Sequence, residues 1–467
     1  MLQSAKLKLP VWEAATVMVI ILAVLSYGII VLGVQPHLPM IFAMVLLMVY
    51  GMIKKVAISD IERGIITGAS SGLGAVYIFF FIGMLISSWM ASGTIPTLMF
   101  YGFELFSDMP LYFSVFVVCS IVGICIGSAF TTSATIGVAF LGMASAMDAS
   151  LAITAGAIVS GAFLGDKMSP LSDTTNLASE TVGVPIFEHI KNMMWTTVPG
   201  FIITAIIFFV ISPGKGGSTE EITTFLAALQ EHSYISLVAL IPFVIVCILA
   251  MFRVSAIPTL SAGIVSSVVI AFISDSSLTF SKMANILFSG FVMDSNVEQL
   301  NSVLSRGGIE SMMFSVSLVL LALGMGGLLF LLGIIPSLLR SIEKVLTNAF
   351  RLIMATACTA IGINFFVGEQ YLSILLTGKT YENQYEKLGY NKKTLSRALE
   401  DTGTVINPLV PWGVSGVFIA GVLGVPTMEY APFAFFCLLC PLLTIFSGLT
   451  QIGLAKHKHT EVSNTIQ

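Results

Sequence analysis

The segment Gly165–Asn176, GDKMSPLSDTTN, decides how this chain folds, because it is a polar break in an otherwise apolar run. It places two carboxylates, one ammonium, four hydroxyls and one amide within twelve residues, which a packed core does not require. Pro170 cannot donate a backbone hydrogen bond and Gly165 loosens the turn before it, so we expect a broken helix with free carbonyl oxygens and a half-helix N-terminus. Carboxylate, hydroxyl and carbonyl oxygens are the ligands of a hard cation. The alternative is a cytoplasmic loop whose Ser, Thr and Asp side chains only cap two helices.

The chain around this segment is too apolar for a soluble protein. Of its 467 residues, 56% are hydrophobic and 10% are charged, whereas an ordinary soluble domain is about 25% charged. Between Arg63 and Lys167 there is no Lys or Arg. Apolar runs recur with about 20 residues, the length that a helix needs to cross a hydrocarbon core of about 30 Å. We therefore predict an all-α polytopic membrane protein that lies in the lipid bilayer, and we exclude nucleic-acid binding.

Three motifs occur twice in the same order. GTIPTL at 93–98 returns as GIIPSL at 333–338, and VGVP at 182–185 returns as LGVP at 423–426. The polar break has a second copy at Asp401–Leu409, DTGTVINPL. The prolines of the copies give the spacing. Pro96 and Pro336 are 240 residues apart, Pro170 and Pro408 are 238 apart, and Pro185 and Pro426 are 241 apart. We infer a duplicated chain, as in many secondary transporters, in which paired broken helices mark the central site.

The charges of equivalent loops predict that the two halves lie inverted in the membrane. Residues 91–110 carry two acids and no base, whereas the equivalent residues 340–351 carry three bases and one acid. Since Lys and Arg are enriched in cytoplasmic loops, these two loops face opposite sides. We divide the chain into a first inverted repeat at 1–212, a linker at 213–232, a second inverted repeat at 233–455 and a cytoplasmic tail at 456–467. Lys6 and Lys8, before the first span, place the N-terminus in the cytoplasm as well.

Each repeat is expected to contain five transmembrane helices and one re-entrant hairpin. The apolar stretches 111–147 and 352–376 must leave and return on one side, because otherwise the basic loop 379–397 would lie outside. Re-entrant backbone is tolerated only where it is buried in protein or lines a watery cavity. The expected spans are 11–34, 38–53, 65–90, 151–180, 193–212, 233–252, 256–274, 311–335, 398–425 and 430–452.

The second break and the two hairpins supply further candidate ligands. They are Asp401, Thr404 and Asn407 in the second break, Thr132 and Ser133 in the first hairpin, and Asn364 and Glu369 in the second. The hairpin hydroxyls could equally bond back to helix carbonyls. Glu369 lies among apolar residues, so its carboxylate needs a cation, a proton or a structural ion pair with Lys167.

The segment Gly165–Ala178 resembles the signature of the NhaC-type sodium/proton antiporters, a family with a branch that exchanges malate and protons for lactate and sodium. The resemblance extends over nearly the whole chain and implies an ion-transporter-type fold in a bacterial plasma membrane, with Na+ and H+ as transported ions and no cofactor. The burial of charge adds Glu369 to the predicted ion- or proton-binding residues, and the repeat adds Thr404. The motif and the burial of charge together assign the others: Asp166, Ser169, Asp173, Thr174, Asn176, Asp401 and Asn407. The Na+ ligands among them are Asp166, Asp173 and Asn407.

The second motif departs from the first. Thr404 and Val405 replace the pair Asp166 and Lys167, and Pro411 stands where Asp173 does. We therefore do not expect two identical ion sites.

Two transport functions fit these residues. The first is secondary active exchange of Na+ for H+, in which Asp166 and Asp173 hold the cation and the proton in turn, because burial disfavours the charged form of a carboxyl group. The second is Na+/H+-coupled exchange of small carboxylates such as malate and lactate. Its substrate-binding residues would be Lys167, Thr132, Ser133 and Asn364.

An intramembrane aspartyl protease is a remote third hypothesis. Asp166 and Asp401 could share a proton as a catalytic dyad. However, Phe163 stands where such enzymes have the first Gly of a Gly-x-Gly-Asp motif. We predict an antiporter and not an enzyme, and the sequence leaves open whether it forms a homodimer.

Overall fold

All secondary structure in the described part of the chain is helical. The computed structural model describes residues 5–106, 109–213, 219–342 and 347–455. Within these ranges, eight helices are long and apolar enough to cross a membrane, or up to eleven if three bent helix pairs each form one span. The prediction of an all-α polytopic membrane protein is confirmed. The expected tail at 456–467 lies outside the described residues.

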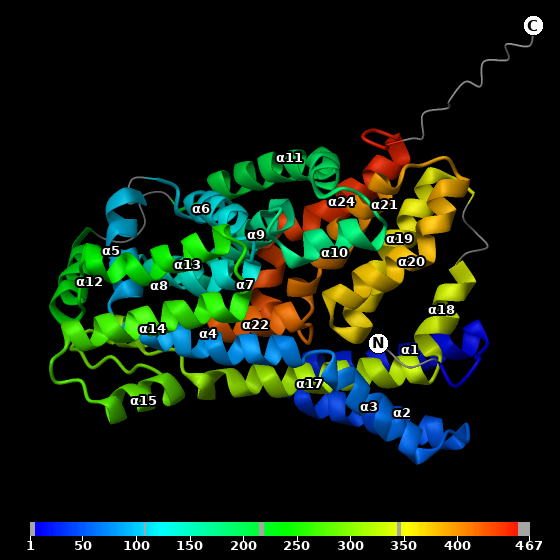
Figure 1. Cartoon of the computed structure of the whole chain (residues 1–467), viewed down its shortest axis with the longest axis horizontal. Helices are drawn as coiled ribbons and strands as arrows, with labels where there is room; N and C mark the ends of the chain where they lie inside the picture. Colours follow the sequence, from blue (N-terminus) through cyan, green and yellow to red (C-terminus); the bar gives the residue numbers. More distant parts are fainter. Residues whose placement is uncertain (1–4, 107–108, 214–218, 343–346, 456–467) are drawn as a thin grey trace, which may run out of the picture.

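The first half of the chain forms α1 to α11, coloured from blue to green in Figure 1. The bounds are α1 Val11–Ser26, α2 His37–Ile53, α3 Ile58–Ser70, α4 Leu73–Ala91, α5 Thr94–Phe106, α6 Leu111–Ile126, α7 Ala129–Thr132, α8 Val138–Ala146, α9 Leu151–Met168, α10 Asp173–Thr181 and α11 Ile186–Ile211. π-Helical turns at Tyr27–Val31 and Ser133–Gly137 continue α1 and join α7 to α8.

The rest of the chain forms α12 to α24. The bounds are α12 Thr219–His232, α13 Ile241–Met251, α14 Ala256–Ser274, α15 Phe280–Ser289, α16 Glu298–Leu304, α17 Ile309–Leu331, α18 Ile334–Ile342, α19 Ala349–Val367, α20 Gln370–Lys387, α21 Lys392–Leu399, α22 Val414–Leu423, α23 Thr427–Tyr430 and α24 Phe435–Thr450. Between α21 and α22 lie a π-helical turn, Glu400–Thr404, and a 3-10 turn, Asn407–Leu409. Further 3-10 turns precede α13 at Leu237–Leu240 and α24 at Ala431–Phe433.

Several helix boundaries differ from the sequence prediction. The expected span 65–90 starts inside α3, a separate helix that ends at Ser70, and α11 starts at Ile186 rather than at 193. The linker 213–232 contains α12, and α15 and α16 were not expected. Hydropathy alone misses such helix ends, because their polar turns lie outside the apolar run.

The second hairpin is longer than predicted. Its arms are α19 and α20, so it covers 349–387 rather than 352–376, and the first part of the expected basic loop 379–397 is helical. Charged residues are tolerated in this end of α20 because they form ion pairs: Lys392 Nζ lies 2.5 Å from Glu382 Oε1 and 3.3 Å from Glu386 Oε1.

Both predicted stretches do form hairpins, and each turns at a glycine with a positive φ. α6 ends at Gly127 (φ 70°) and Ser128 caps α7, while α19 ends at Gly368 (φ 75°) and Glu369 caps α20. A Cβ on Gly127 would lie 2.6 Å from Leu171 Cβ, so the turn needs glycine for space as well as for conformation.

Hydrogen bonds show that each hairpin returns to the side it came from. In the first, the backbone N–H of Ser150, after α8, donates to the hydroxyl of Tyr112 at the start of α6 over 3.0 Å. In the second, the hydroxyl pairs Thr359–Tyr381 (2.8 Å) and Thr356–Tyr385 (3.2 Å) join the antiparallel arms. The hairpin form of both stretches is confirmed.

Backbone landmarks repeat at the spacing of the sequence motifs. Three pairs of glycines with positive φ recur at this spacing. Gly93 (φ 77°) and Gly333 (73°) are 240 residues apart. Gly127 (70°) and Gly368 (75°), like Gly183 (68°) and Gly424 (69°), are 241 residues apart. This agreement supports a duplicated fold. The inverted orientation of the two halves stays a prediction.

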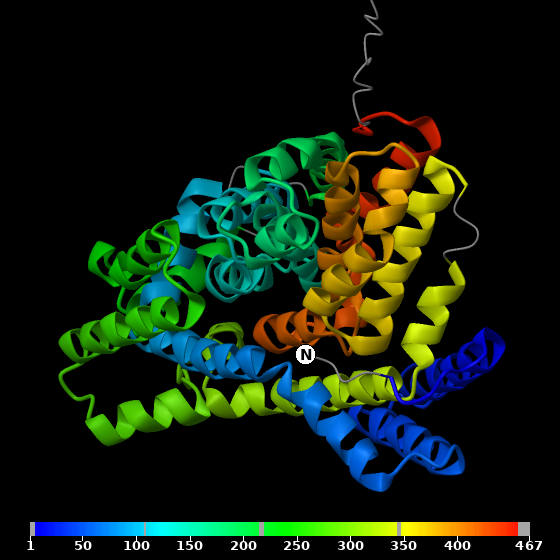
Figure 2. The ribbon, with the colours of Figure 1, turned by 45° about the vertical axis from the view of Figure 1, so that its right-hand side comes forward.

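Two groups of helices surround the polar breaks. Figures 1 and 2 show α4, α14 and α17 running along one side of the molecule, with the α19–α20 hairpin next to α24 on another side. α3 of the first half crosses α17 of the second at Gly68 and Gly327, where a Cβ on Gly68 would lie 2.8 Å from Gly327 Cα. The halves are therefore in direct backbone contact at this crossing.

Candidate ion-binding site

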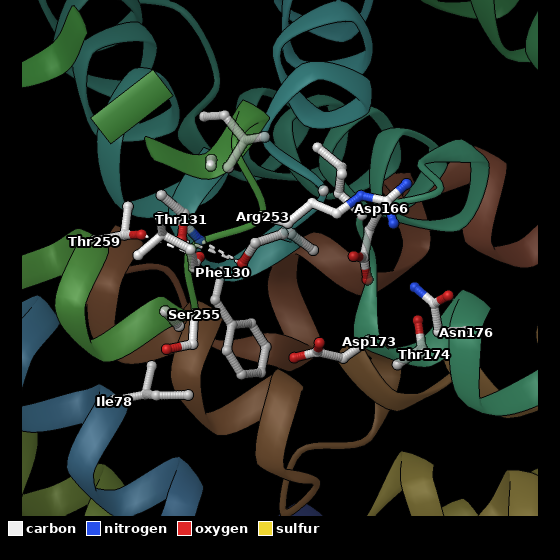
Figure 3. Close-up of a pocket in the computed structure, with 18 of the residues that line it drawn as sticks. Ile78, Phe130, Thr131, Asp166, Asp173, Thr174, Asn176, Arg253, Ser255 and Thr259 are labelled. Atoms are coloured by element: carbon white, nitrogen blue, oxygen red, sulfur yellow. Dashed lines mark hydrogen bonds between the residues drawn. The ribbon is translucent and has the colours of Figure 1, made fainter. Parts of the chain in front are cut away.

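A cavity of about 350 Å3 lies at the first polar break. Five segments line it: Ile78 of α4, the tip of the first hairpin at 126–131, the break between α9 and α10, the α13–α14 loop with the start of α14, and Gln370 and Tyr371 of the second hairpin. Figure 3 shows Asp166, Asp173, Thr174 and Asn176 on one side of this cavity. The structure thus brings together both hairpin tips and one broken helix, as the sequence predicted for a central site.

The break in the helix provides the two carboxylates of the cavity. α9 ends at Met168 and α10 starts at Asp173, with Pro170 between them. Asp166, in the last turn of α9, is buried next to the Ser172 and Thr174 hydroxyls and the Ala129 N–H of the first hairpin. Asp173 is exposed to the cavity. It lies in the first turn of α10, where the helix dipole favours a negative charge.

Other polar residues of the break bind its own backbone. The Thr175 hydroxyl contacts the carbonyls of Asp166 (3.2 Å) and Lys167 (3.0 Å), which the break frees. The Asn176 amide donates to the carbonyls of Pro170 (3.0 Å) and Ser172 (2.7 Å). The Ser172 hydroxyl accepts the Thr175 N–H over 3.4 Å and so caps α10. The capping alternative therefore describes Ser172, Thr175 and Asn176, whereas Asp166 and Asp173 cap neither α9 nor α10.

Ser169 and Thr174 connect the break to its surroundings. The Ser169 hydroxyl accepts a hydrogen bond from the Leu171 N–H over 3.2 Å. It lies next to Gly127, at the tip of the first hairpin. The Thr174 hydroxyl donates to Glu400 Oε1 of the second break over 3.1 Å. Thr174 therefore joins the cavity to the other half of the chain.

Glu400 is a site residue that the sequence analysis missed. It is fully buried at the start of the π-helical turn Glu400–Thr404, and its Oε2 atom has no hydrogen-bond partner. Such turns occur frequently at functional sites. The signal was present in the sequence, because Glu400 directly precedes the residue Asp401 that was selected from the second break.

Lys167 does not line the cavity. It is fully buried and forms an ion pair with Asp401, which also accepts hydrogen bonds from the hydroxyls of Thr196 (2.8 Å) and Thr444. The Lys167 ammonium lies 3.5 Å from Cys440 Sγ. The partner of Lys167 is thus Asp401, and not Asp166 or Glu369 as the sequence analysis considered.

The second break is held by a pair of buried amides. Asn407 Nδ2 donates to Asn364 Oδ1 over 2.8 Å, and Asn407 Oδ1 accepts from the Ser415 N–H over 2.7 Å. Asn364 in turn donates to the Gly403 carbonyl over 2.7 Å. Both amides are occupied within the protein, whereas the buried hydroxyl of Thr404 has no partner.

The hairpin candidates act mainly on their own helices. Glu369 Oε2 accepts the Leu372 N–H over 2.7 Å, so this buried carboxylate caps α20 rather than pairing with Lys167. The Thr132 hydroxyl donates to the Ser128 carbonyl over 2.9 Å. The buried hydroxyl of Ser133 has no partner. None of these three residues lines the cavity.

Arg253 is a second residue that the sequence analysis missed. It lies in the α13–α14 loop with φ of 59° and is exposed, and among the described residues it is the only basic one that lines the cavity. Figure 3 shows its side chain extending across the cavity toward Asp166. A single basic residue in a short loop gave no signal that it would reach a central site.

The ligand set of the cavity suits an alkali cation better than a transition metal. Among the described residues there is no group of three or more His, Cys, Asp and Glu side chains that could hold a metal ion. The cavity offers instead two carboxylates, the hydroxyls of Ser128 and Thr131, and backbone carbonyls. Oxygen ligands of this kind bind hard cations.

Comparison with known proteins gives consistent matches. Residues 161–452 match the model of the Na+/H+ antiporter family. The chain is 43% identical over 440 residues to the Na+/H+ antiporter NhaC of Alkalihalophilus pseudofirmus, covering 94% of this chain and 95% of that one. It is 38% identical to the Na+/H+ antiporter NhaC of Bacillus subtilis, covering 94% and 97%. It is also 34% identical to the malate-2H+/Na+-lactate antiporter of Bacillus subtilis, covering 84% of each chain.

Proposed function

Because this chain belongs to the Na+/H+ antiporter family, we propose that its transported ions bind in the cavity between Asp166 and Asp173. The protein is a secondary transporter and not an enzyme, and it exchanges Na+ for H+. The bacterial plasma membrane, with both termini in the cytoplasm, is the location we propose. The observation that carries the site assignment is that two carboxylates flank one helix break and face one cavity.

Competition between Na+ and H+ follows from the closeness of these carboxylates. The charged form of a buried carboxylate such as Asp166 is disfavoured next to a second carboxylate unless a cation balances the two. When Na+ binds Asp173 and Asp166, with hydroxyls of the hairpin tip as further ligands, both carboxylates are ionised. When Na+ leaves, protons replace it. A site that holds either ion, but not both, couples the two transport steps.

Glu400 extends this site toward the second half of the chain. Its Oε1 atom accepts the Thr174 hydroxyl, which in turn lies 3.0 Å from the Ser172 hydroxyl next to Asp166. A fully buried carboxylate with one oxygen unpartnered is more stable in its neutral, protonated form. We propose that Glu400 holds a proton behind the cavity and exchanges it with Asp166 through these hydroxyls.

Proton release driven by Na+ in proteoliposomes tests the assignment. Asp173→Asn should reduce exchange to the level of protein-free vesicles, because a neutral amide neither balances Na+ nor releases a proton. Glu400→Gln should lower the exchange rate about tenfold or more, because an amide can neither hold the proton nor pass it to Asp166. Asp148→Asn is the matched control, since Asp148 is an exposed acid outside the cavity whose φ of 49° suits Asn. Full activity of Asp173→Asn would remove this residue from the ion site.

Coupled exchange of small carboxylates is a second candidate, which Arg253 favours. Lys167, the cation proposed for such a substrate, is occupied by Asp401, whereas Arg253 lies in the cavity. Exchange should be measured with malate inside and lactate outside, and with neither. Flux that appears only with the carboxylates and disappears in Arg253→Gln would establish this function. Exchange without any organic anion would establish simple Na+/H+ antiport.

A further inference from the structure

A second cavity, of about 420 Å3, shares no residue with the proposed ion site. It lies between α4, the end of α15, the loop before α17, and the end of α22. Its polar side chains are Arg306 and the serines Ser289, Ser305 and Ser311. No acidic residue is among those that line it. The cavity therefore carries a net positive charge.

Arg306 is a partly buried cation without an anionic partner in the described part of the chain. Its Nη1 atom donates to the Leu423 carbonyl, at the C-terminus of α22, over 2.9 Å. Burial lowers the pKa of this guanidinium from its ordinary value, and no nearby carboxylate opposes the effect. Buried charges in proteins are usually paired, because an unpaired one loses its hydration without compensation. The remaining N–H groups of Arg306 are thus available to an anion.

Further donors surround this guanidinium. The Ser305 hydroxyl already accepts the Met293 N–H over 3.0 Å and keeps its own hydrogen to donate. α17, a helix of 23 residues, starts at the cavity, and its N-cap residue Gly308 has no side chain to cap the first turn. The free N–H groups of such a turn favour a negative charge. They add to the positive charge of Arg306.

The remaining wall of the cavity is apolar. It consists of aliphatic, aromatic and thioether side chains from four different segments: Ile86, Phe291, Val292, Met312 and Val422. Chloride or inorganic phosphate would gain nothing from such a wall, whereas a short organic acid would place its hydrocarbon part there. The planar fork of a guanidinium matches the two oxygens of a carboxylate.

We propose that this cavity binds a small carboxylate anion, held at its charged end by Arg306. The site is separate from the Na+ cavity, and the proposal does not depend on how Na+ and H+ bind. Arg306 would link the anion to α22, the helix that follows the second polar break, because it also donates to the Leu423 carbonyl.

Ligand-dependent melting of the purified full-length protein tests the proposal. The melting temperature should be followed by intrinsic fluorescence in detergent without Na+, with choline lactate or choline acetate added at constant ionic strength. Both should raise the melting temperature in a saturable way, and choline chloride should not. Arg306→Gln should weaken the apparent affinity for lactate about tenfold or more, and Arg306→Lys should weaken it less, because it keeps the charge but loses the fork.

Two further variants keep the test decisive. Lys282→Gln removes one positive charge from an exposed position on α15 outside the cavity, so it should bind lactate like the wild type. Ser289→Phe places a large side chain at the exposed rim and should abolish binding even if Arg306→Gln does not fold. The proposal would be overturned if choline chloride raised the melting temperature as much as lactate does, or if lactate raised it equally in Arg306→Gln. It would also be overturned if the protein responded only to vesicles with phosphatidylglycerol.

Discussion

Lys167 and Asp401 are two opposite charges from different halves of the chain that meet where no water reaches them. Both side chains are fully buried, and the carboxylate also accepts the hydroxyls of Thr196 and Thr444. Hydrogen bonds of this kind are what make a buried ion pair tolerable, because the desolvation cost of two charges can exceed their mutual attraction. The pair therefore contributes more to the specificity of the arrangement than to stability.

Removal of one partner should be far more harmful than removal of both charges. Asp401→Asn leaves the Lys167 ammonium unpaired, and such a change costs about 3–5 kcal/mol. Lys167→Met combined with Asp401→Asn removes both charges while the amide oxygen still accepts the Thr196 and Thr444 hydroxyls. We expect the melting temperature in detergent to fall strongly in each single variant and to return close to that of the wild type in the double variant. Additive losses would show that the two residues do not interact.

At the residue scale, sequence reasoning found groups that are costly to bury. Asp166, Lys167, Asp173 and Asp401 were selected because ionisable residues in apolar segments are rare. The sequence could not tell which of them pair with each other, since that depends on how the two halves dock. It also missed Arg253, whose loop position gave no hint of its reach into the cavity.

The hairpin tips are the elements that close the site from both sides. In each, a glycine with positive φ ends one helix and a polar residue caps the next: Gly127 with Ser128, and Gly368 with Glu369. Gly127 lies against Leu171 of the broken helix. The position of the first tip is thus fixed by contact with the segment that carries Asp166 and Asp173.

A matched pair of glycine variants can separate this contact from backbone strain. Gly127→Ala and Gly389→Ala both place a side chain at positive φ (70° and 77°), which costs about 1–2 kcal/mol. At Gly127 the new Cβ would also lie 2.6 Å from Leu171 Cβ, whereas at Gly389 nothing lies within 4 Å. We expect Na+/H+ exchange to fall at least tenfold in Gly127→Ala and to change little in Gly389→Ala. Similar rates in both variants would show that the tip contact is not needed.

At the element scale, breaks were easier to predict than helix ends. Pro170 cannot continue a helix, and the helix breaks around it, between Met168 and Asp173. Gly165, by contrast, lies inside α9, where it packs against Gly123 of α6. The end of α20 was not predicted, because a charged segment looks like a loop unless its partners are known. Its ion pairs with Lys392 depend on the following turn.

The whole molecule combines two halves whose backbone landmarks recur every 240 or 241 residues. Internal motifs in the sequence predict the same duplication. Their charge pattern also predicts that the halves are inverted, a property of the protein in its membrane. That prediction needs a measurement from both sides of the bilayer.

Single-cysteine labelling can test the orientation of the halves. In a background without the exposed thiols of Cys125 and Cys358, cysteines should replace four exposed residues in turn: Lys55, Lys387, Glu104 and Ser277. A membrane-impermeant maleimide should label positions 104 and 277 in intact cells, and positions 55 and 387 only in inverted vesicles. Labelling of positions 55 and 277 from the same side would mean that the halves are parallel.

The hydrogen bonds and the ion pair between the two broken segments also limit how the protein can move. Lys167 bonds to Asp401, Thr174 to Glu400, and the His189 ring lies 2.9 Å from the Ser396 hydroxyl. If these segments separated within the membrane, their charged and polar groups would lose their hydrogen-bond and ion-pair partners in an apolar environment. These contacts therefore hold the segments together as one packed unit inside the protein.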